Sequence, residues 1–281
     1  MCSGVVQGAA APIPHGTLDL IAENQSIAVG HKFYVGLHFQ LEKGWHIYWV
    51  NPGDSGEPPR VKWQLPAGFT AGTMEWPTPR RLGTPSIVDF GYEDSIMLIV
   101  PMTSGASLAP QQSAQIGAEV RVLVCREMCI PGKAQISLTL PIKARPTPDA
   151  QSKDLFAATR KSSPQPAPGN WKFSASEAKD SFLLTGNLGH QVTKAIFFPL
   201  AESQIDNPAT QKLEPTATGF RLTLRKSNQL LKPVNRLKGV LALSADHSYS
   251  IDVPVTKPSE ARNNDGVRNF LAQSLEEGLQ P

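Results

Sequence analysis

The chain has 281 residues, and its 27 lysines and arginines nearly balance 24 aspartates and glutamates, so the net charge is only +3. The basic residues are scattered, and the apolar run Ile96–Val100 is far shorter than the roughly 20 residues of a membrane helix. We therefore expect neither a nucleic-acid partner nor a membrane span. The 25 prolines and 22 glycines separate short alternating stretches, which predicts an all-β chain long enough for two domains.

Residues 1–11 resemble the end of a secretory signal peptide, with small residues and an A-x-A-like site. They have no basic region and only a short apolar one, which indicates a truncated or mis-assigned start. Cleavage would remove Cys2, although a lipid-anchored Cys2 is an alternative. Cys125 and Cys129 then remain, and an even pair in an exported protein fits an oxidising compartment.

Residues 12–145 are predicted to form the first β domain, because apolar side chains recur at every second position. In the stretch after Gly44, the residues Trp45, Ile47 and Trp49 share one face and are interpreted as core, with His46 as a structural histidine. Loops are expected where prolines, glycines and acidic residues gather, at 76–81 and 85–95. Strands are expected at 17–22, 31–41, 61–65, 96–102, 114–124 and 135–140.

Three residues separate Cys125 from Cys129, between two alternating stretches. In one continuous strand their Cα atoms would lie roughly 13 Å apart. A hairpin with Arg126-Glu127-Met128 as its loop places them opposite each other, which suits a disulfide. A bond here closes so short a loop that it stabilises the fold by only about 2 kcal/mol. The pair suits opening and closing, although an ordinary structural disulfide, or a Cu(I) site of Cys125, Met128 and Cys129, is also compatible with the spacing.

After the first domain the composition changes. Residues 146–169 are predicted to be a proline-rich linker, with a short helix at 149–160 that buries Leu155 and Phe156. Residues 170–257 are predicted to form a second β-sandwich, in which we find no cluster of residues suited to chemistry. In the tail, residues 258–281, apolar side chains recur at helical spacing and predict a short amphipathic helix.

Four segments together resemble the periplasmic N-terminal region of DsbD-type thiol:disulfide interchange proteins, and more closely the ScsB-type branch, which is linked with suppression of copper sensitivity. These segments are 44–56, Trp76-Pro77, 91–93 and 124–132. The resemblance covers roughly residues 16–256, the second domain only loosely. It implies two immunoglobulin-like β-sandwiches joined by the proline-rich linker. Full-length members continue into membrane helices and a thioredoxin-like domain, so we expect this chain to be a fragment, a truncated product or a stand-alone relative.

The resemblance also implies an activity. A periplasmic protein-disulfide reductase domain of this kind takes electrons from a thioredoxin-like donor, which a membrane-embedded domain supplies. It passes them through Cys125 and Cys129 to disulfide-containing periplasmic proteins, and no cofactor is expected. The alternatives are a non-catalytic binding module with a structural disulfide, and a Cu(I)-binding copper-tolerance protein.

In the family, a loop with an aromatic residue caps the disulfide, and well-known members space their cysteines more widely than this chain does. The similar loop here implies Phe90 and Tyr92 as the cap, with Asp89 and Glu93 exchanging protons. Either cysteine could attack, with a weak preference for Cys129. Charges near a thiol shift its pKa, so Arg126 and Lys133 are expected to lower it and Glu127 to raise it.

Overall fold

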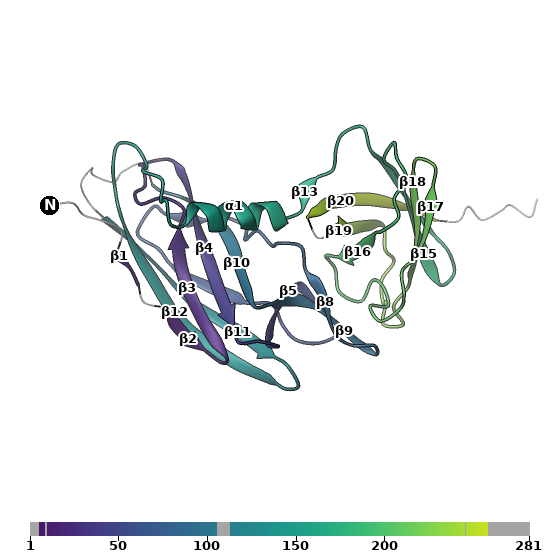
Figure 1. Ribbon diagram of the computed structural model, residues 1–281, viewed down its shortest axis with the longest axis horizontal. Helices are drawn as coiled ribbons and strands as arrows, with labels where there is room; N and C mark the ends of the chain where they lie inside the picture. Colours follow the sequence, from purple (N-terminus) through teal and green to yellow (C-terminus); the bar gives the residue numbers. More distant parts are fainter. Residues whose placement is uncertain (1–5, 9, 106–112, 245, 258–281) are drawn as a thin grey trace, which may run out of the picture.

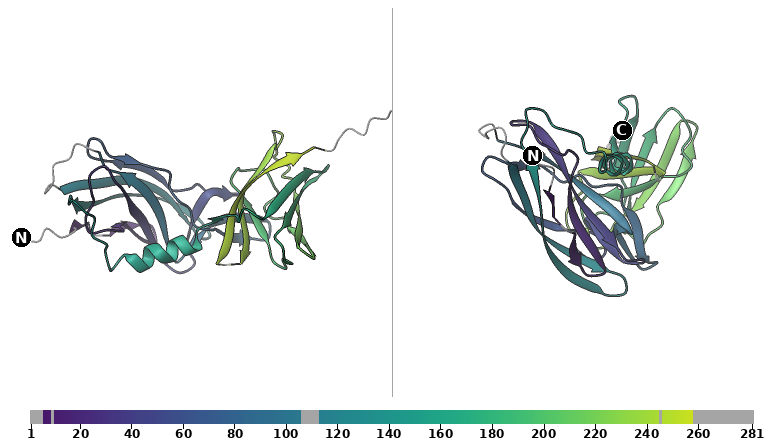
Figure 2. Two further views of the ribbon diagram at one scale, coloured as in Figure 1. Left: turned by 90° about the horizontal axis from the view of Figure 1, so that it is seen from above. Right: turned by 60° about the vertical axis from the view of Figure 1, so that its left-hand side comes forward.

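The structure is a computed structural model that describes residues 6–8, 10–105, 113–244 and 246–257. The expected tail helix at 258–281 lies outside these residues. The regular structure of the described chain is β-strand apart from one helix, and the chain forms two bodies that follow each other along the long axis (Figures 1 and 2). Of the helical segments in this described part, none has the length and apolar character needed to cross a membrane.

The first body is a sandwich of two sheets. One sheet has the order β1-β12-β11-β5-β9-β8, with β6 also paired to β11, and the other has the order β2-β3-β4-β10-β7. The larger sheet comprises β1 (Val6–Gln7), β5 (His46–Gly53), β6 (Arg60–Gln64), β8 (Arg80–Thr84), β9 (Ile87–Glu93), β11 (Ser113–Cys125) and β12 (Cys129–Pro141). The smaller sheet comprises β2 (Ala11–Ile13), β3 (Gly16–Ala22), β4 (Lys32–Leu41), β7 (Thr70–Ala71) and β10 (Ser95–Thr103).

The core of this sandwich follows from the alternation in its strands. Every second residue points inward, so Leu37 and Phe39 of β4 face Ile116 and Leu138 of the other sheet, and all four are fully or almost fully buried. The expected strands are therefore present. Val6–Gln7 pairs with β12 within the stretch interpreted as a signal-peptide remnant; whether that stretch is removed stays a prediction.

The two expected loops differ from the structure: β8 begins at Arg80, within the loop expected at 76–81, and residues 85–95 are not a loop. Residues 87–93 form β9, which pairs with β8 on one side and β5 on the other. The physical reason is a period-2 pattern hidden among glycines and acidic residues, in which Val88, Phe90 and Tyr92 all face the core. Only Pro85-Ser86 remains as the turn between the two strands.

The single helix of the described residues, α1 (Lys153–Ser162), packs on the outer face of the smaller sheet (Figure 1). Its Phe156 is fully buried against Met97 and Ile99 of β10. Arg160 makes two hydrogen bonds to the Glu23 carboxylate, one of them 2.9 Å long between Nη2 and Oε2. The expected helix is present, beginning four residues later than its predicted start. The domain limits at 146 and 170 stay predictions.

The second body is a sandwich made by one sheet that curls over a core, with the order β16-β19-β20-β14-β15-β18-β17, and β13 pairs with β20. Phenylalanines from three of its strands, Phe182, Phe197 and Phe220, meet in a separate core. Its strands are β13 (Gln165–Pro166), β14 (Lys172–Glu177), β15 (Ser181–Asn187), β16 (Ile196–Pro199), β17 (Lys212–Thr216), β18 (Gly219–Arg225), β19 (Arg236–Ser244) and β20 (His247–Thr256).

The two bodies are joined by packing as well as by the chain. Phe198 of β16 belongs to the core of the first sandwich, where its ring meets Phe90 edge-on at 5.3 Å and Trp49 at 6.3 Å. Aromatic pairs of this geometry contribute about 0.5–1.5 kcal/mol beyond the burial of their area. The second body therefore contacts β5 and β9, two strands of the sheet that carries the cysteines.

Candidate redox site

The site is built on the β11–β12 hairpin. Cys125 ends one strand and Cys129 begins the next, and the two are direct cross-strand partners with Cα atoms 4.1 Å apart. A disulfide joins them, and the amide of Arg126 donates to the carbonyl of Met128 at 3.2 Å across the short loop. The predicted hairpin and its pairing of the cysteines are confirmed.

The two sulfur-bearing residues differ in their exposure to solvent. Cys125 is 2% exposed, whereas Cys129, the first residue of β12, is exposed and follows Met128, which is 66% exposed. An attacking thiolate of another protein can approach the disulfide only through a sulfur that it can reach. The difference in burial therefore distinguishes the two cysteines, which the sequence did not: Cys129 is the one that another protein can reach.

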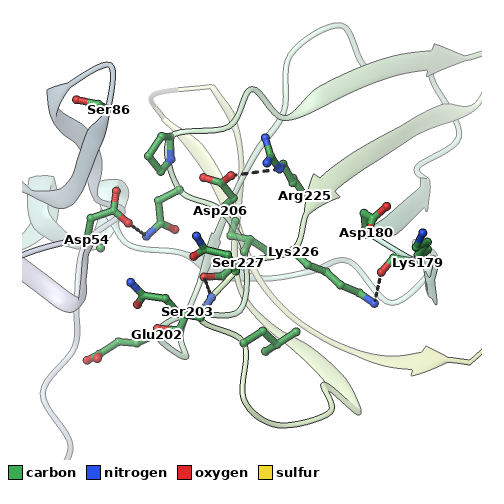
Figure 3. A pocket seen from close by; sticks show the side chains of 17 residues that line it. Asp54, Ser86, Lys179, Asp180, Glu202, Ser203, Asp206, Arg225, Lys226 and Ser227 are labelled. Carbon is green, nitrogen blue, oxygen red and sulfur yellow. Dashed lines mark hydrogen bonds and ion pairs between the residues drawn. The ribbon is translucent and has the colours of Figure 1, made fainter.

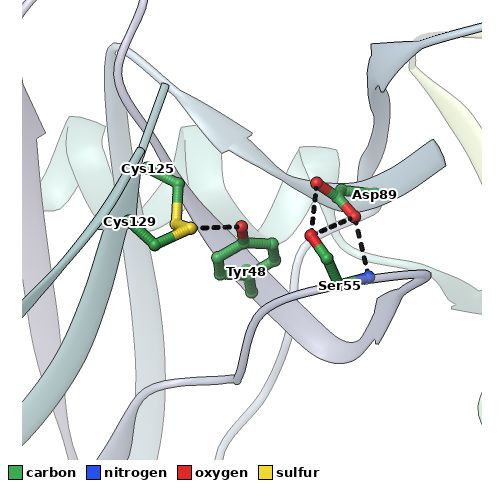
Figure 4. Close-up of a disulfide and its surroundings, with 5 residues drawn as sticks. All are labelled: Tyr48, Ser55, Asp89, Cys125 and Cys129. Carbon is green, nitrogen blue, oxygen red and sulfur yellow. Dashed lines mark hydrogen bonds between the residues drawn. A yellow bond between two sulfur atoms is a disulfide. The ribbon is translucent and has the colours of Figure 1, made fainter. Parts of the chain in front are cut away.

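Tyr48 lies directly against the disulfide. Its hydroxyl is 3.5 Å from Sγ of Cys129, and the residue is 1% exposed (Figure 4). Burial raises the pKa of the Tyr48 phenol, which hydrogen bonding to Ser55 opposes. The phenol therefore stays protonated and keeps its ability to donate to the sulfur over the working pH range. It is the polar side chain in contact with Cys129 that the sequence reasoning missed.

A signal for Tyr48 was present in the alternation of β5. Trp45, Ile47 and Trp49 point into the sandwich core, so His46 and Tyr48 must point to the opposite face of the same strand. The first three residues were correctly interpreted as core. The cross-strand register that brings this second face to the cysteines could not be read from the sequence, because β5 and β11 lie far apart in the chain.

His46 is the cross-strand neighbour of both Cys125 and Glu93. It is 7% exposed, its ring meets Tyr48 edge-on at 5.2 Å, and its Nε2 has no hydrogen-bond partner within the described structure. Burial lowers the pKa of His46, while the carboxylates of Asp89 and Glu93 act in the opposite direction. The result is a neutral imidazole beside the buried cysteine.

The acidic residues proposed for proton transfer lie on this same face. Asp89 is 6% exposed and accepts hydrogen bonds from the amide of Ser55 at 3.0 Å and from its hydroxyl at 2.9 Å (Figure 4). Burial raises the pKa of the Asp89 carboxyl, and the bonds from Ser55 counteract part of that rise. Glu93 also pairs with Arg80 at 3.9 Å. Both carboxylates thus face the His46 side of the sheet.

The expected aromatic cap is not formed by Phe90 and Tyr92. These side chains are 1% and 4% exposed, they lie in the sandwich core, and the Tyr92 hydroxyl donates to the carbonyl of Pro77 at 2.7 Å. Their alternation with Asp89, Gly91 and Glu93 in β9 sends them to the face opposite the cysteines. Tyr48, from β5, is the aromatic residue at the disulfide.

The predicted pKa modulators are spread along the hairpin. Arg126 places its guanidinium 5.0 Å from the centre of the Trp45 ring, which itself stacks on His15 at 3.7 Å. Glu127 is exposed in the loop. Lys133 lies four residues beyond Cys129 and pairs with Glu119 at 3.1 Å. Arg126 is thus held beside the cysteines, whereas Lys133 is engaged further along the hairpin.

The described residues contain no group of three or more histidine, cysteine or acidic side chains arranged to hold a metal ion. The Cu(I) set of Cys125, Met128 and Cys129 would require the disulfide to be reduced, because both sulfurs are joined to each other here.

Residues 18–141 match the sequence family described as thiol:disulfide interchange protein DsbD, N-terminal. The match lies within the first sandwich and includes both cysteines. With the disulfide at Cys125 and Cys129, this sandwich is a thiol:disulfide interchange domain.

Solved structures show how far the fold is shared. The N-terminal periplasmic domain of ScsB from Proteus mirabilis aligns with a TM-score of 0.66 and 14% identity, over 90% of this chain and 99% of that one. The periplasmic chaperone SfaE aligns over 85% of this chain and 100% of its own at 9% identity, but its TM-score is only 0.22. No curated protein matched the chain. The two-sandwich architecture is therefore that of the ScsB domain, and the suspected family is confirmed.

Proposed function

We propose that this chain is a periplasmic protein-disulfide reductase domain. It accepts electrons from a thioredoxin-like donor, which a membrane-embedded domain recharges, and it passes them to disulfide-containing periplasmic proteins. The observation that carries the proposal is a disulfide between an exposed residue, Cys129, and a buried one, Cys125, whose cross-strand neighbour is the buried His46.

The exchange takes place in two halves. A thiolate of the donor attacks Sγ of Cys129, the Cys125–Cys129 bond breaks, and Cys125 leaves as a thiolate. A second thiolate of the donor then releases Cys129, so the pair has gained two electrons and the donor is oxidised to a disulfide. In the second half, the Cys129 thiolate attacks the substrate disulfide, and Cys125 attacks Cys129 in the mixed disulfide to release the reduced substrate.

Two side chains on the same face of the sheet as the cysteines can donate hydrogen bonds to the sulfur atoms or exchange protons with them. The Tyr48 hydroxyl, which touches Cys129, is placed to donate a hydrogen bond to its thiolate. His46 is the cross-strand neighbour of Cys125, at a position where side chains usually lie about 4.5–5.5 Å apart. Its unpartnered nitrogen can take the proton of the buried Cys125 thiol when that sulfur must attack, and return it afterwards.

A partner can approach along the exposed surface next to Cys129. Leu123 and Pro131 lie two residues before and after the pair, and they line a groove of about 440 Å³ beside it. The basic side chains of Arg60, Arg121 and Lys133 also line this groove. Glu57 lines the groove as well and pairs with Arg60, while Arg121 and Lys133 both pair with Glu119. An extended segment flanking a partner's cysteine fits such a groove, and its mixed charges favour a partner with polar residues there.

The first test is the redox equilibrium of the pair against glutathione, read by alkylation of free thiols. An exchanging pair is expected well above about −300 mV, the range below which structural disulfides usually fall. A pair that stays oxidised under strongly reducing conditions would make the disulfide structural and would leave a non-catalytic binding module as the function.

Single-cysteine variants test the two roles. The C125S variant keeps the exposed Cys129 and is expected to form a stable mixed disulfide with a thioredoxin-like protein or a substrate, because the resolving thiol is gone. C129S is the matched control, since it keeps only the buried Cys125 of the pair and should trap little at this site; Cys2 is replaced by serine in both variants. Equal trapping by both variants would contradict the assigned roles.

A further inference from the structure

Residues 51–56, which comprise the end of β5 and the bend after it and are here called the turn, join the redox site to the second sandwich. We propose that the second sandwich positions Tyr48 at Cys129 by holding this turn, with Asn207 as the main positioning residue. The inference rests on the proposed function for its biological meaning, but its geometry and its test concern the reduced protein alone.

The turn is tied to the second sandwich at its start. Asn51 is 1% exposed, and its side-chain amide donates to the carbonyl of Pro199 at 2.8 Å and to that of Ala201 at 3.3 Å. Its own Oδ1 accepts from the amide of Gly53 at 3.1 Å, which closes the turn. A buried amide that uses both its ends in this way fixes where the chain leaves β5.

The turn is tied a second time in its middle. Asn207 is 6% exposed and donates from Nδ2 to Oδ1 of Asp54 at 2.8 Å, while its carbonyl accepts from Arg81 at 2.6 Å. The other carboxylate oxygen of Asp54 accepts from the amide of Val88 at 2.8 Å. Asp54 also lines a polar cleft of about 810 Å³, together with Asp206 of the second sandwich (Figure 3).

From Asp54 the contacts continue to the sulfur. The next residue, Ser55, is held by Asp89 through its amide and hydroxyl. Gly56 then lies so close to the Tyr48 ring that a Cβ there would be 2.1 Å from its Cζ. The position of this backbone therefore limits where the ring can lie, and the hydroxyl of that ring is 3.5 Å from Sγ of Cys129. Asn207 thus acts on Cys129 through the turn and Tyr48.

The experiment is a double-mutant cycle of N207A and Y48F, in which the rate of Cys129 alkylation is measured against pH in the reduced C125S protein. In the Tyr48 background, N207A should slow alkylation at neutral pH by about two- to tenfold, the range that one hydrogen bond provides. In the Y48F background, N207A should have no further effect, because the residue through which it acts has lost its hydroxyl.

The control is T78A, which removes another hydrogen bond between the two bodies, the one between the hydroxyls of Thr78 and Ser248, without touching the turn. It should leave the alkylation rate unchanged. If N207A fails to fold, N207D keeps the side-chain size and faces the Asp54 carboxylate with a like charge, so it should loosen the turn and give the same dependence on Tyr48. An unchanged rate, an equal change in both backgrounds or an equal effect of T78A would overturn the proposal, whatever the reduction potential of the pair.

Discussion

Replacing Tyr48 with phenylalanine tests the contact at the centre of the site. The Y48F substitution removes one oxygen and keeps the ring that Gly56 packs against. In the oxidised protein the hydroxyl meets a disulfide sulfur, which is a weak acceptor. In the reduced protein it meets a thiolate, to which it can donate a charge-assisted bond. Y48F therefore destabilises mainly the reduced protein in which the Cys129 thiol is ionised.

The magnitude follows from the geometry. A hydrogen bond to a charged group is worth about 1.5–3 kcal/mol, and a separation of 3.5 Å to sulfur favours the lower end. A change of about 1.4 kcal/mol corresponds to one pKa unit. We therefore expect Y48F to raise the pKa of the Cys129 thiol by about one unit. The same free energy lowers the reduction potential by about 30 mV, because the two-electron reduction product is less stable.

The assays are the pH dependence of Cys129 alkylation in the C125S protein and the glutathione equilibrium of the intact pair. Y92F is the matched control, since it removes a second buried tyrosine hydroxyl, one that donates to Pro77 on the core side of the sheet. It should cost stability and leave both redox values unchanged. Unaltered values in Y48F, or equal shifts in Y92F, would refute the role given to Tyr48.

Three further predictions concern the surroundings of the site. G56A should displace the ring beneath it and slow Cys129 alkylation as well as destabilise the fold, whereas G30A, with a similar positive φ but open space around it, should only destabilise it. F156A should lower the free energy of unfolding by about 3–5 kcal/mol in urea titrations without changing the reduction potential. Burial lowers the pKa of His46 and of His38, so the unfolded chain binds more protons and stability should fall as pH drops below their ordinary value of 6.5. H46Q and H38Q should each reduce that loss between about pH 7.5 and pH 5.5, and an unchanged loss in both would contradict the buried, neutral state.

Sequence reasoning predicted those features that depend on local pattern. The hairpin, its loop and the pairing of Cys125 with Cys129 follow from residues that are close together in the chain. The inner face of β5 was readable for the same reason. The site itself needs registers between distant strands, such as Cys125 with His46, and local periodicity carries no information about those.

The error at residues 85–95 has a related cause. Proline, glycine and acidic residues there are typical of a loop, and they obscured the alternation of Val88, Phe90 and Tyr92. An inner strand of a sheet can carry Asp89 and Gly91 on its other face when that face is covered and the carboxylate is hydrogen-bonded, as it is by Ser55. The aromatic cap was then assigned to side chains that the sandwich uses for its core.

The alternation in β5 explains how the face of the sheet that carries His46 and Tyr48 is kept in position. Trp45, Ile47 and Trp49 are locked in the sandwich core, so the backbone that carries His46 and Tyr48 is fixed by burial on the opposite side. The core does not fix the residues that cover this outer face. Those residues belong to the turn, in which Gly56 lies against the Tyr48 ring. Because the second sandwich holds that turn, losing the contacts between the second sandwich and the turn should leave the disulfide in place and change the rate at which the sulfur of Cys129 reacts.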